Sequence, residues 1–267
     1  MAELASSPDR AVVAKLVVVG ALTGFLAGLF GIGGGILVVP ALVMLLGMDQ
    51  RLAHGTSLAA VLPISVASVV TYASQGNVDW ALAAPLAVGS VAGVLMGTAY
   101  LRVARVRTLQ VMFAVLLVVS AVRLFVPVDA DGRTSLSMLG IVVAVVVGLA
   151  SGTLAGLLGI GGGVVVVPAL ILGFGLVPVL AKGASVAAII PAALVGTARN
   201  RVNRNANLRA AVFIGAAGVL TAVLGGIVSD RLDDDVAIVL FAVLLLVIAG
   251  RVIFQLRRPP PVGHPAP

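Results

Sequence analysis

Two stretches of nearly identical sequence decide how this chain is organised. Residues 24–35 read GFLAGLFGIGGG, and residues 152–163 read GTLAGLLGIGGG, 128 positions later. The same offset, without a gap, carries Pro40 onto Pro168. A constant register over such a distance indicates that one unit is written twice.

The composition indicates whether water or lipid surrounds this repeated unit. The chain has 267 residues, of which 61% are hydrophobic and only 10% are charged, and its mean hydropathy is +1.22. Apolar runs of about 20 residues recur with charges between them, which is the length needed to cross the hydrocarbon core of a bilayer. The sequence therefore predicts an all-α polytopic membrane protein whose surroundings are lipid.

Each half divides into five apolar segments. In the first half they lie at 12–30, 35–47, 53–74, 81–101 and 108–126, and each has a counterpart 128 residues later. The second segment is too short to cross comfortably, and the first one ends in a run of glycines. The first two segments of each repeat therefore either span fully or form a re-entrant, glycine-broken hairpin, and the sequence leaves both arrangements open.

These boundaries give a domain organisation for the whole chain. Two repeats of about five helical segments are expected, flanked by polar ends. The predicted units are a cytoplasmic tail at 1–10, a first transmembrane repeat at 11–127, a non-cytoplasmic linker at 128–136, a second repeat at 137–255 and a disordered cytoplasmic tail at 256–267.

The placement of arginine predicts how the two repeats are oriented. The connection at 102–107 carries three arginines, whereas the equivalent connection at 230–235 is acidic; the loop at 75–79 has no cation, whereas 199–204 carries three. Arginine-rich loops lie on the cytoplasmic side of a membrane. Equivalent loops then face opposite sides, which predicts an inverted-topology repeat in the cytoplasmic membrane with both termini in the cytoplasm, an arrangement typical of secondary transporters.

The glycine clusters are the first candidate for a functional site. Consecutive glycines break a helix and leave backbone N–H groups free where the next helix begins, and such a helix start attracts anions. The alternative is a tight break that serves packing only. The candidate substrate-binding glycines are Gly31, Gly33, Gly34 and Gly35, with Gly159, Gly161, Gly162 and Gly163.

The third segment of each half adds polar side chains to this candidate site. His54, Thr56 and Ser57 stand at its start in the first half, and Lys182 and Ser185 occupy the matching positions in the second. A basic group and a hydroxyl one turn apart suit an anion in a low-dielectric setting. Two alternatives stay open: the basic residues lie at the interface and reach water, and the serines bond carbonyls one turn earlier in their own helix.

Several classes of chemistry are disfavoured by what the sequence lacks. The chain has no cysteine and two histidines, and no carboxylate lies deep in a predicted span. We therefore expect no catalytic residues, no metal site, no cofactor and no enzyme activity, and the basic residues mark topology rather than nucleic-acid binding. Proton coupling would then run through His54 or through the substrate's own protonation, and the remaining alternative is an uncoupled facilitator.

The combined motifs resemble those of a known family. The paired GxxGxGGG blocks at 28–35 and 156–163, each followed by Pro-Ala-Leu and then by Gly-Thr-Ser or Gly-Ala-Ser, are similar to those of the TauE/SafE family of sulfite exporter-like membrane permeases. The resemblance covers about residues 12–255. It implies transport of sulfite, sulfonates or related sulfur-containing organic anions across the cytoplasmic membrane.

The sequence thus supports a permease for a small anion as the leading hypothesis. The competing hypothesis is a non-transporting membrane assembly or scaffold protein, in which the glycines serve only to pack helices. Neither the particular anion, the direction of transport, the coupling ion nor the oligomeric state follows from the sequence.

Overall fold

The computed structural model describes residues 10–100 and 137–257, together with scattered positions between 111 and 122. Within these ranges the chain is helical. The fifth predicted segment, at 108–126, lies mostly outside the described residues, and the linker and most of both tails lie wholly outside them.

The helices of the first half follow the predicted segments closely. They are α1 (Arg10–Phe30), α2 (Gly35–Leu46), α3 (Gln50–Ser74) and α4 (Trp80–Tyr100). The second half contains α6 (Met138–Leu158), α7 (Gly163–Phe174), α8 (Pro178–Val202), α9 (Leu208–Arg231) and α10 (Asp234–Arg257). The prediction of an all-α membrane protein is confirmed, because seven of the described helices have the length and composition to cross a bilayer.

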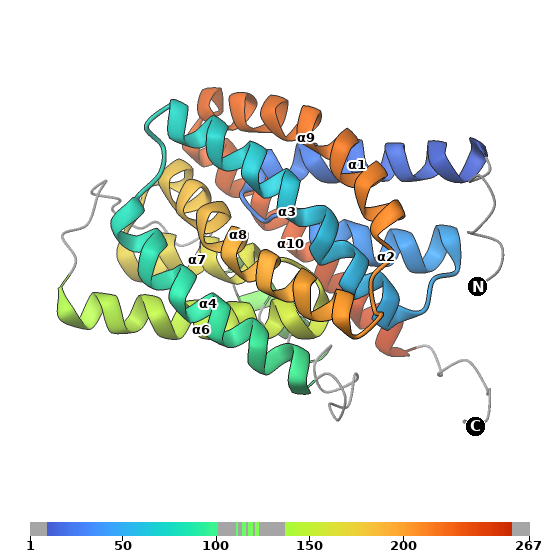
Figure 1. The fold of residues 1–267 in the computed structure, drawn as a ribbon. Coiled ribbons are helices and arrows are strands. Elements are labelled where there is room, and N and C mark those ends of the chain that lie inside the picture. Colours follow the sequence, from blue (N-terminus) through green and yellow to red (C-terminus); the bar gives the residue numbers. More distant parts are fainter. Residues whose placement is uncertain are drawn as a thin grey trace.

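The two short helices differ from the rest. α2 and α7 have 12 residues each, so each is about 18 Å long at 1.5 Å per residue, well short of the hydrocarbon core. Each is bounded by glycines in the left-handed conformation, with φ of 79° at Gly34 and 61° at Gly47 and closely similar values at Gly162 and Gly175. In Figure 1 α2 runs back alongside α1 toward the end at which α1 begins.

Contacts between the halves come in matched pairs. α1 packs on α9 as α6 packs on α4, and α3 packs on α9 as α8 packs on α4, while α3 and α8 pack on each other. The start of α3 at Gly55 lies against the Asn205 carbonyl, and the start of α8 at Gly183 lies against the Asn77 carbonyl. This reciprocity is what two copies of one unit related by a twofold axis are expected to produce.

Glycines spaced by four make the α1–α9 and α4–α6 contacts close. A Cβ on Gly24 would lie 2.0 Å from the Gly218 carbonyl oxygen, and one on Gly152 would lie 2.1 Å from the Ser90 carbonyl oxygen. Without a hydrophobic drive between helices in lipid, such backbone approach supplies the dispersion contacts that hold helices together. These glycines therefore fix the outer helices, and α3 and α8, the most buried of the spans, occupy the centre.

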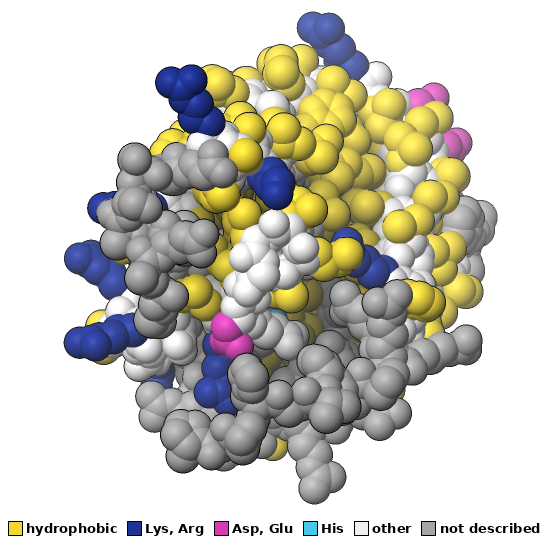
Figure 2. All heavy atoms as spheres, turned by 90° about the vertical axis from the view of Figure 1, so that its right-hand side faces the viewer, with side chains coloured by type: hydrophobic (Ala, Val, Ile, Leu, Met, Phe, Trp, Pro, Cys, Tyr) yellow, Lys and Arg dark blue, Asp and Glu magenta, His cyan; other side chains and the backbone are white. Residues whose placement is uncertain are grey.

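One end of the molecule is rich in cations. α1 begins there and α10 ends there, as the right-hand side of Figure 1 shows. Figure 2 looks onto this end and shows Lys and Arg side chains spread around a largely hydrophobic surface. We call it the arginine-rich end; it includes Arg51 and the α8–α9 connection with Arg201 and Arg204.

Candidate functional site

The two glycine breaks meet at the centre of the molecule. A Cβ on Gly35 would lie 2.5 Å from the Gly159 carbonyl oxygen, and one on Gly163 would lie 2.6 Å from the Gly31 carbonyl oxygen. A Cβ on Gly161 would lie 3.8 Å from the Gly33 Cα, and one on Gly33 would lie 3.1 Å from Ile189 of α8 and 3.3 Å from Val61 of α3. The predicted glycines of both halves are therefore brought into one cluster.

The start of each short helix opens onto this junction without a side-chain cap. Gly34 and Gly162 are the N-cap residues of α2 and α7, and neither position has a side-chain hydrogen bond to the first turn. Their left-handed φ angles are readily adopted only by glycine. The preceding helix packs against each N-cap glycine: Thr23 of α1 lies against Gly34, and Ser151 of α6 lies against Gly162. The Ser151 hydroxyl donates to the Gly162 carbonyl.

The two predicted serines lock the breaks together across the halves. The Ser57 hydroxyl donates to the Gly159 carbonyl at 2.8 Å, and the Ser185 hydroxyl donates to the Gly31 carbonyl at 2.9 Å. Neither bond goes to a carbonyl one turn earlier, so the alternative of simple intrahelical bonding is wrong for both serines. Each hydroxyl satisfies a carbonyl that the helix break leaves without a helical partner.

The backbones of the two predicted basic residues lie against the glycine breaks. A Cβ on Gly31 would lie 2.6 Å from the Lys182 Cα, and one on Gly159 would lie 2.8 Å from the His54 Cα. Both side chains are buried, with 2% of Lys182 and 6% of His54 exposed. The alternative that these residues reach water at the interface therefore does not hold for the described conformation.

Lys182 and His54 differ in their partners. The Lys182 ammonium donates to the Ser229 hydroxyl at 2.9 Å. The His54 ring hydrogen-bonds the backbone of Leu157, whereas His54 Nδ1 is buried and has no hydrogen-bond partner among the described residues. A buried polar atom without a partner costs about 1–3 kcal/mol. The Thr23 hydroxyl beside Gly34 is a second such atom among the described residues.

Thr56 has a structural role in this conformation. Its hydroxyl donates to the Leu52 carbonyl and accepts from the Asn207 backbone N–H at 2.9 Å. It thus ties the start of α3 to the connection before α9. The matching residue in the second half, Ala184, cannot make this contact.

A cavity of about 340 Å³ reaches the cluster from one side. Its inner wall includes His54, Ile36 from the first turn of α2 and Ile160 from the second glycine break. Gln50 and Arg251 are its other polar residues, and the remaining walls come from α2, α10 and Leu158. We call this space the His54 cavity; its described lining includes Ile160 of the second break, Ile36 in the first turn of α2 and His54, but none of the predicted glycines.

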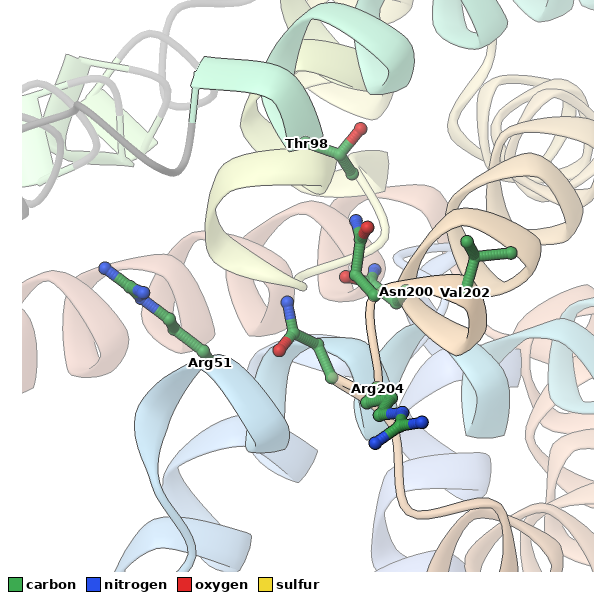
Figure 3. Close-up of a pocket in the computed structure, with 7 residues that line it drawn as sticks. Arg51, Thr98, Asn200, Val202 and Arg204 are labelled. Atoms are coloured by element: carbon green, nitrogen blue, oxygen red, sulfur yellow. The ribbon is translucent and has the colours of Figure 1, made fainter.

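A second cavity, of about 430 Å³, lies at the arginine-rich end. Polar residues line most of it, with Thr98 and Asn200 buried and the arginines exposed. Figure 3 shows Arg51 and Arg204 extending away from one another, so the two guanidinium groups do not converge on one point. Among the described residues, these guanidinium groups place positive charge at this end but do not surround one point.

Arg204 adopts an unusual backbone conformation in that cavity. Its φ is 57°, and it is the one non-glycine residue with positive φ among the described residues. The matching position 128 residues earlier is Gly76, with φ 74°. Placing arginine in this conformation costs about 1–2 kcal/mol, a strain that commonly marks a functional position.

Sequence reasoning did not single out Tyr72 or Ser229. Tyr72 is fully buried, and its hydroxyl donates to the Gly28 carbonyl at 2.5 Å and also contacts Ser229. The 128-residue offset pairs Tyr72 with Asn200, so the same comparison that paired His54 with Lys182 could have found this site.

No group of three or more potential metal ligands occurs among the described residues.

The fold and site define a polytopic helical membrane protein with a buried, cation-backed junction of broken helices. Comparison with known families then identifies the group. A family model described as Sulfite exporter TauE/SafE matches residues 2–124 and 144–267. The chain therefore belongs to the TauE/SafE family and is a membrane transporter.

Individual relatives agree with this assignment. The chain is 24% identical to YunE of Bacillus subtilis, described as a probable membrane transporter protein, over 90% of this chain and 97% of that one. It is 28% identical to a probable membrane transporter protein of Xylella fastidiosa over 88% and 93% of the two chains, and 30% identical to MJ0441 of Methanocaldococcus jannaschii over 68% and 69%. No solved structure matches the chain.

Proposed function

We propose that this transporter is a permease for a small anion: sulfite, a sulfonate or a related sulfur-containing organic anion. The family description supports the substrate class. The physical support comes from positive charge: His54 and Lys182 are the basic groups next to the junction, and the exposed Arg51 and Arg204 line the cavity at the arginine-rich end. The proposal assigns no chemical step to the chain.

The observation that carries the proposal is the unpartnered Nδ1 of His54 next to a cavity lined by Ile160 of the second break and by Ile36 at the start of α2. An anion in this cavity lies next to the uncapped start of α2, where the helix dipole and free N–H groups favour negative charge. Arg251 lines the same space and adds positive charge to it.

The predicted glycines, serines and Lys182 complete the proposed pathway. Ser57 and Ser185 hold the breaks closed through bonds to Gly159 and Gly31. When those bonds open, two hydroxyl donors and the start of α7 become available to the anion. Lys182 lies against Gly31 as His54 lies against Gly159. Lys182 therefore offers a second half-site, in which the basic group is an ammonium instead of an imidazole.

Binding at His54 is proposed to carry a proton. Leu157 lies in the last turn of α6, where carbonyls lack a helical partner, so the ring donates to it and does so through Nε2, because Nδ1 has no partner. Nδ1 can donate to an anion only when the ring takes a second proton. Asp49 and Arg251 are the charged groups nearby, and their opposite charges act on that proton in opposite directions.

The orientation in the membrane belongs to the same proposal. The arginine-rich end faces the cytoplasm, in keeping with the preference of Lys and Arg for that side. Both tails then lie in the cytoplasm of the cell that carries the protein in its cytoplasmic membrane, and the two repeats run in opposite directions through the bilayer.

Reconstitution tests the proposal directly. Flux of sulfite, methanesulfonate, sulfate and nitrate is measured into liposomes that contain the full chain, and sulfite or sulfonate flux is expected to exceed that of protein-free liposomes. His54→Ala is expected to reduce the flux, whereas His264→Ala, which changes the other histidine of the chain, leaves it unchanged. Flux equal to that of empty liposomes for every anion would refute the assignment.

A further inference from the structure

A groove of about 480 Å³ runs between α1 and α2, and we call it the α1–α2 groove. Its lining residues are Ala14, Lys15, Val18, Val19, Leu22 and Thr23 of α1, Leu37, Pro40, Ala41, Met44 and Leu45 of α2, and Arg251 of α10. The spacing by three and four places each set on one face of its helix. Val18, Leu22 and Met44 are 57%, 61% and 67% exposed, so the groove opens onto the outer surface of the protein.

Both cations of the groove lie at the same end of it. α2 begins beside Thr23, because a Cβ on Gly34 would lie 2.4 Å from the Thr23 Cγ2, and α2 then runs back alongside α1 (Figure 1). Lys15 is eight residues before Thr23 and Met44 is ten residues after Gly34, or about 12 Å and about 15 Å along their helices. Arg251 contacts the Met44 sulfur. Lys15 and Arg251 therefore lie at similar depth, toward the arginine-rich end.

The rest of the groove is apolar and carries no compensating charge. Apart from Lys15, Arg251 and the deeper Thr23, the described lining consists of alanine, valine, leucine, proline and methionine, and none of it is acidic. Cations near the end of a membrane-spanning helix are stabilised by reaching the interface, where phosphate groups of lipids pair with them. The groove thus combines a positively charged end with an apolar length.

The second repeat shows that the lysine is not a general feature of the fold. The 128-residue offset carries Lys15 of α1 onto Val143 of α6, which is 41% exposed. The matching face of the second repeat therefore has an apolar side chain where the α1–α2 groove has an ammonium group. The charge distinguishes the two faces, so a charged ligand is expected to distinguish them as well.

We infer that the α1–α2 groove binds an anionic phospholipid from the leaflet at the arginine-rich end. The phosphate of the head group lies between Lys15 and Arg251, and one acyl chain lies along the groove against Val18, Leu22 and Ala41. Charge complementarity selects an anionic head group over a zwitterionic one, and the apolar length selects a lipid over a free phosphate. This inference goes beyond the proposed function and does not depend on it.

The position of the groove connects the bound lipid with the interior of the protein. Leu37, Pro40, Met44 and Arg251 line both the α1–α2 groove and the His54 cavity. The lipid consequently contacts the short helix that separates the two spaces.

Native mass spectrometry of the purified full chain tests the inference. The chain is offered equal amounts of phosphatidylglycerol and phosphatidylcholine with the same acyl chains, and one phosphatidylglycerol per chain is expected to be retained in preference. A ligand that binds the folded state also raises the unfolding temperature, so phosphatidylglycerol is expected to raise it more than phosphatidylcholine. Glycerol 3-phosphate and inorganic phosphate are expected not to displace the lipid. Equal retention of both lipids, or displacement by free phosphate, would overturn the inference.

Two variants with matched controls assign the binding to this groove. Lys15→Gln is expected to lower the affinity for phosphatidylglycerol about fivefold, the effect of one cation near an anionic lipid surface, without changing that for phosphatidylcholine. Arg201→Gln removes an exposed cation at the same end but outside the groove and is expected to have no such effect.

Ala41→Phe fills the groove and is expected to weaken the retention of both lipids, whereas Ala169→Phe, at the matching position of α7, retains them. A preference for phosphatidylglycerol that is unchanged in Lys15→Gln contradicts the inference, as does full retention in Ala41→Phe. A dimer mass without bound phospholipid would show that a second copy of the chain occupies the groove, and it would equally refute the lipid site.

Discussion

Substitution of Gly31 by alanine tests whether the contact between the breaks depends on glycine at that position. Gly31 has φ 68°, so a Cβ there carries a left-handed strain of about 1–2 kcal/mol. The same Cβ would lie 2.6 Å from the Lys182 Cα and 2.8 Å from its carbonyl oxygen. An overlap of this kind typically costs about 1–3 kcal/mol, so the free energy of unfolding is expected to fall by about 2–5 kcal/mol.

The chain offers controls that separate the two contributions. Gly47 has φ 61° but nothing within 4 Å of an added Cβ, so Gly47→Ala carries the strain alone, about 1–2 kcal/mol. Gly35 is helical, and its Cβ would meet the Gly159 carbonyl at 2.5 Å, so Gly35→Ala carries mainly the overlap. All three substitutions replace glycine by alanine, so each adds the same side chain, one methyl group.

Denaturant unfolding of the purified protein measures these differences, and flux in liposomes shows whether the junction matters for transport. We expect Gly31→Ala to be the most costly of the three and to lose flux, and Gly47→Ala to retain it. If Gly31→Ala costs no more than Gly47→Ala, the backbone at the junction does not approach Lys182 as closely as described, and the argument for a shared central site fails.

Three further substitutions address single groups. His54→Gln is expected to keep anion flux measurable but to remove its response to an imposed pH gradient, which a pH-sensitive dye inside the liposomes reports; an unchanged response would exclude His54 as the proton carrier. Lys182→Met removes the buried cation that the proposal places in the second half-site, so the apparent KM for the anion is expected to rise about tenfold or more, since a charged hydrogen bond to the anion contributes about 1.5–3 kcal/mol; a KM equal to that of the unmodified chain removes Lys182 from the site. Arg204→Gly relieves the left-handed strain and is expected to raise the free energy of unfolding by about 1 kcal/mol, while flux falls at low ionic strength and matches the unmodified chain in high salt, where surface charges are screened; flux that is equal at both salt concentrations would exclude a role for Arg204 in attracting the anion.

The segment boundaries could be read from the sequence because bilayer thickness and helix propensity act locally. The offset of 128 residues located α2 and α7 and their breaks, and the helices begin and end within a few residues of the expected positions. The spacing of Gly20, Gly24 and Gly28 likewise defines a face, and the structure places that face against α9.

How the two repeats pack against each other does not follow from the 128-residue offset. Ser57 bonds the break of the other half rather than its own helix, and this depends on how far α3 and α8 slide past each other, which no local pattern specifies. The sequence places Thr56 among the predicted donors to the anion, whereas in the structure its hydroxyl accepts from the Asn207 backbone N–H, 151 residues away. Long-range hydrogen bonds of single hydroxyls follow from packing, and packing follows from the whole sequence.

Differences between matched positions carry information that the similarities do not. Asn200 lines the cavity at the arginine-rich end, whereas its counterpart Tyr72 is fully buried at the opposite end of the α3–α8 pair. The Tyr72 hydroxyl bonds the Gly28 carbonyl, and Lys182 bonds Ser229 nearby. Tyr72 is thus a bulky side chain bonded to α1, whereas the smaller, buried Asn200 bonds within its own helix and lines a cavity. We take the Tyr72 end as the more tightly closed end of this conformation. Transport across the membrane requires that the closed end open in turn.

Tyr72→Phe tests this requirement, because it removes the hydroxyl and keeps the ring. Loss of one hydrogen bond worth about 0.5–1.5 kcal/mol is expected to raise the population of molecules open at that end by about two- to tenfold. The chain has no cysteine, so a single cysteine at Val179, which packs against the Tyr72 cluster, reports opening through its rate of reaction with a membrane-impermeant maleimide. The rate at Val179→Cys is expected to rise in Tyr72→Phe, whereas a cysteine at the exposed Val202, near the opposite end, reacts at the same rate with and without the change. Equal rates at Val179→Cys in both backgrounds would mean that the Tyr72 hydroxyl does not hold this end closed, and the difference between Tyr72 and Asn200 would then concern packing alone.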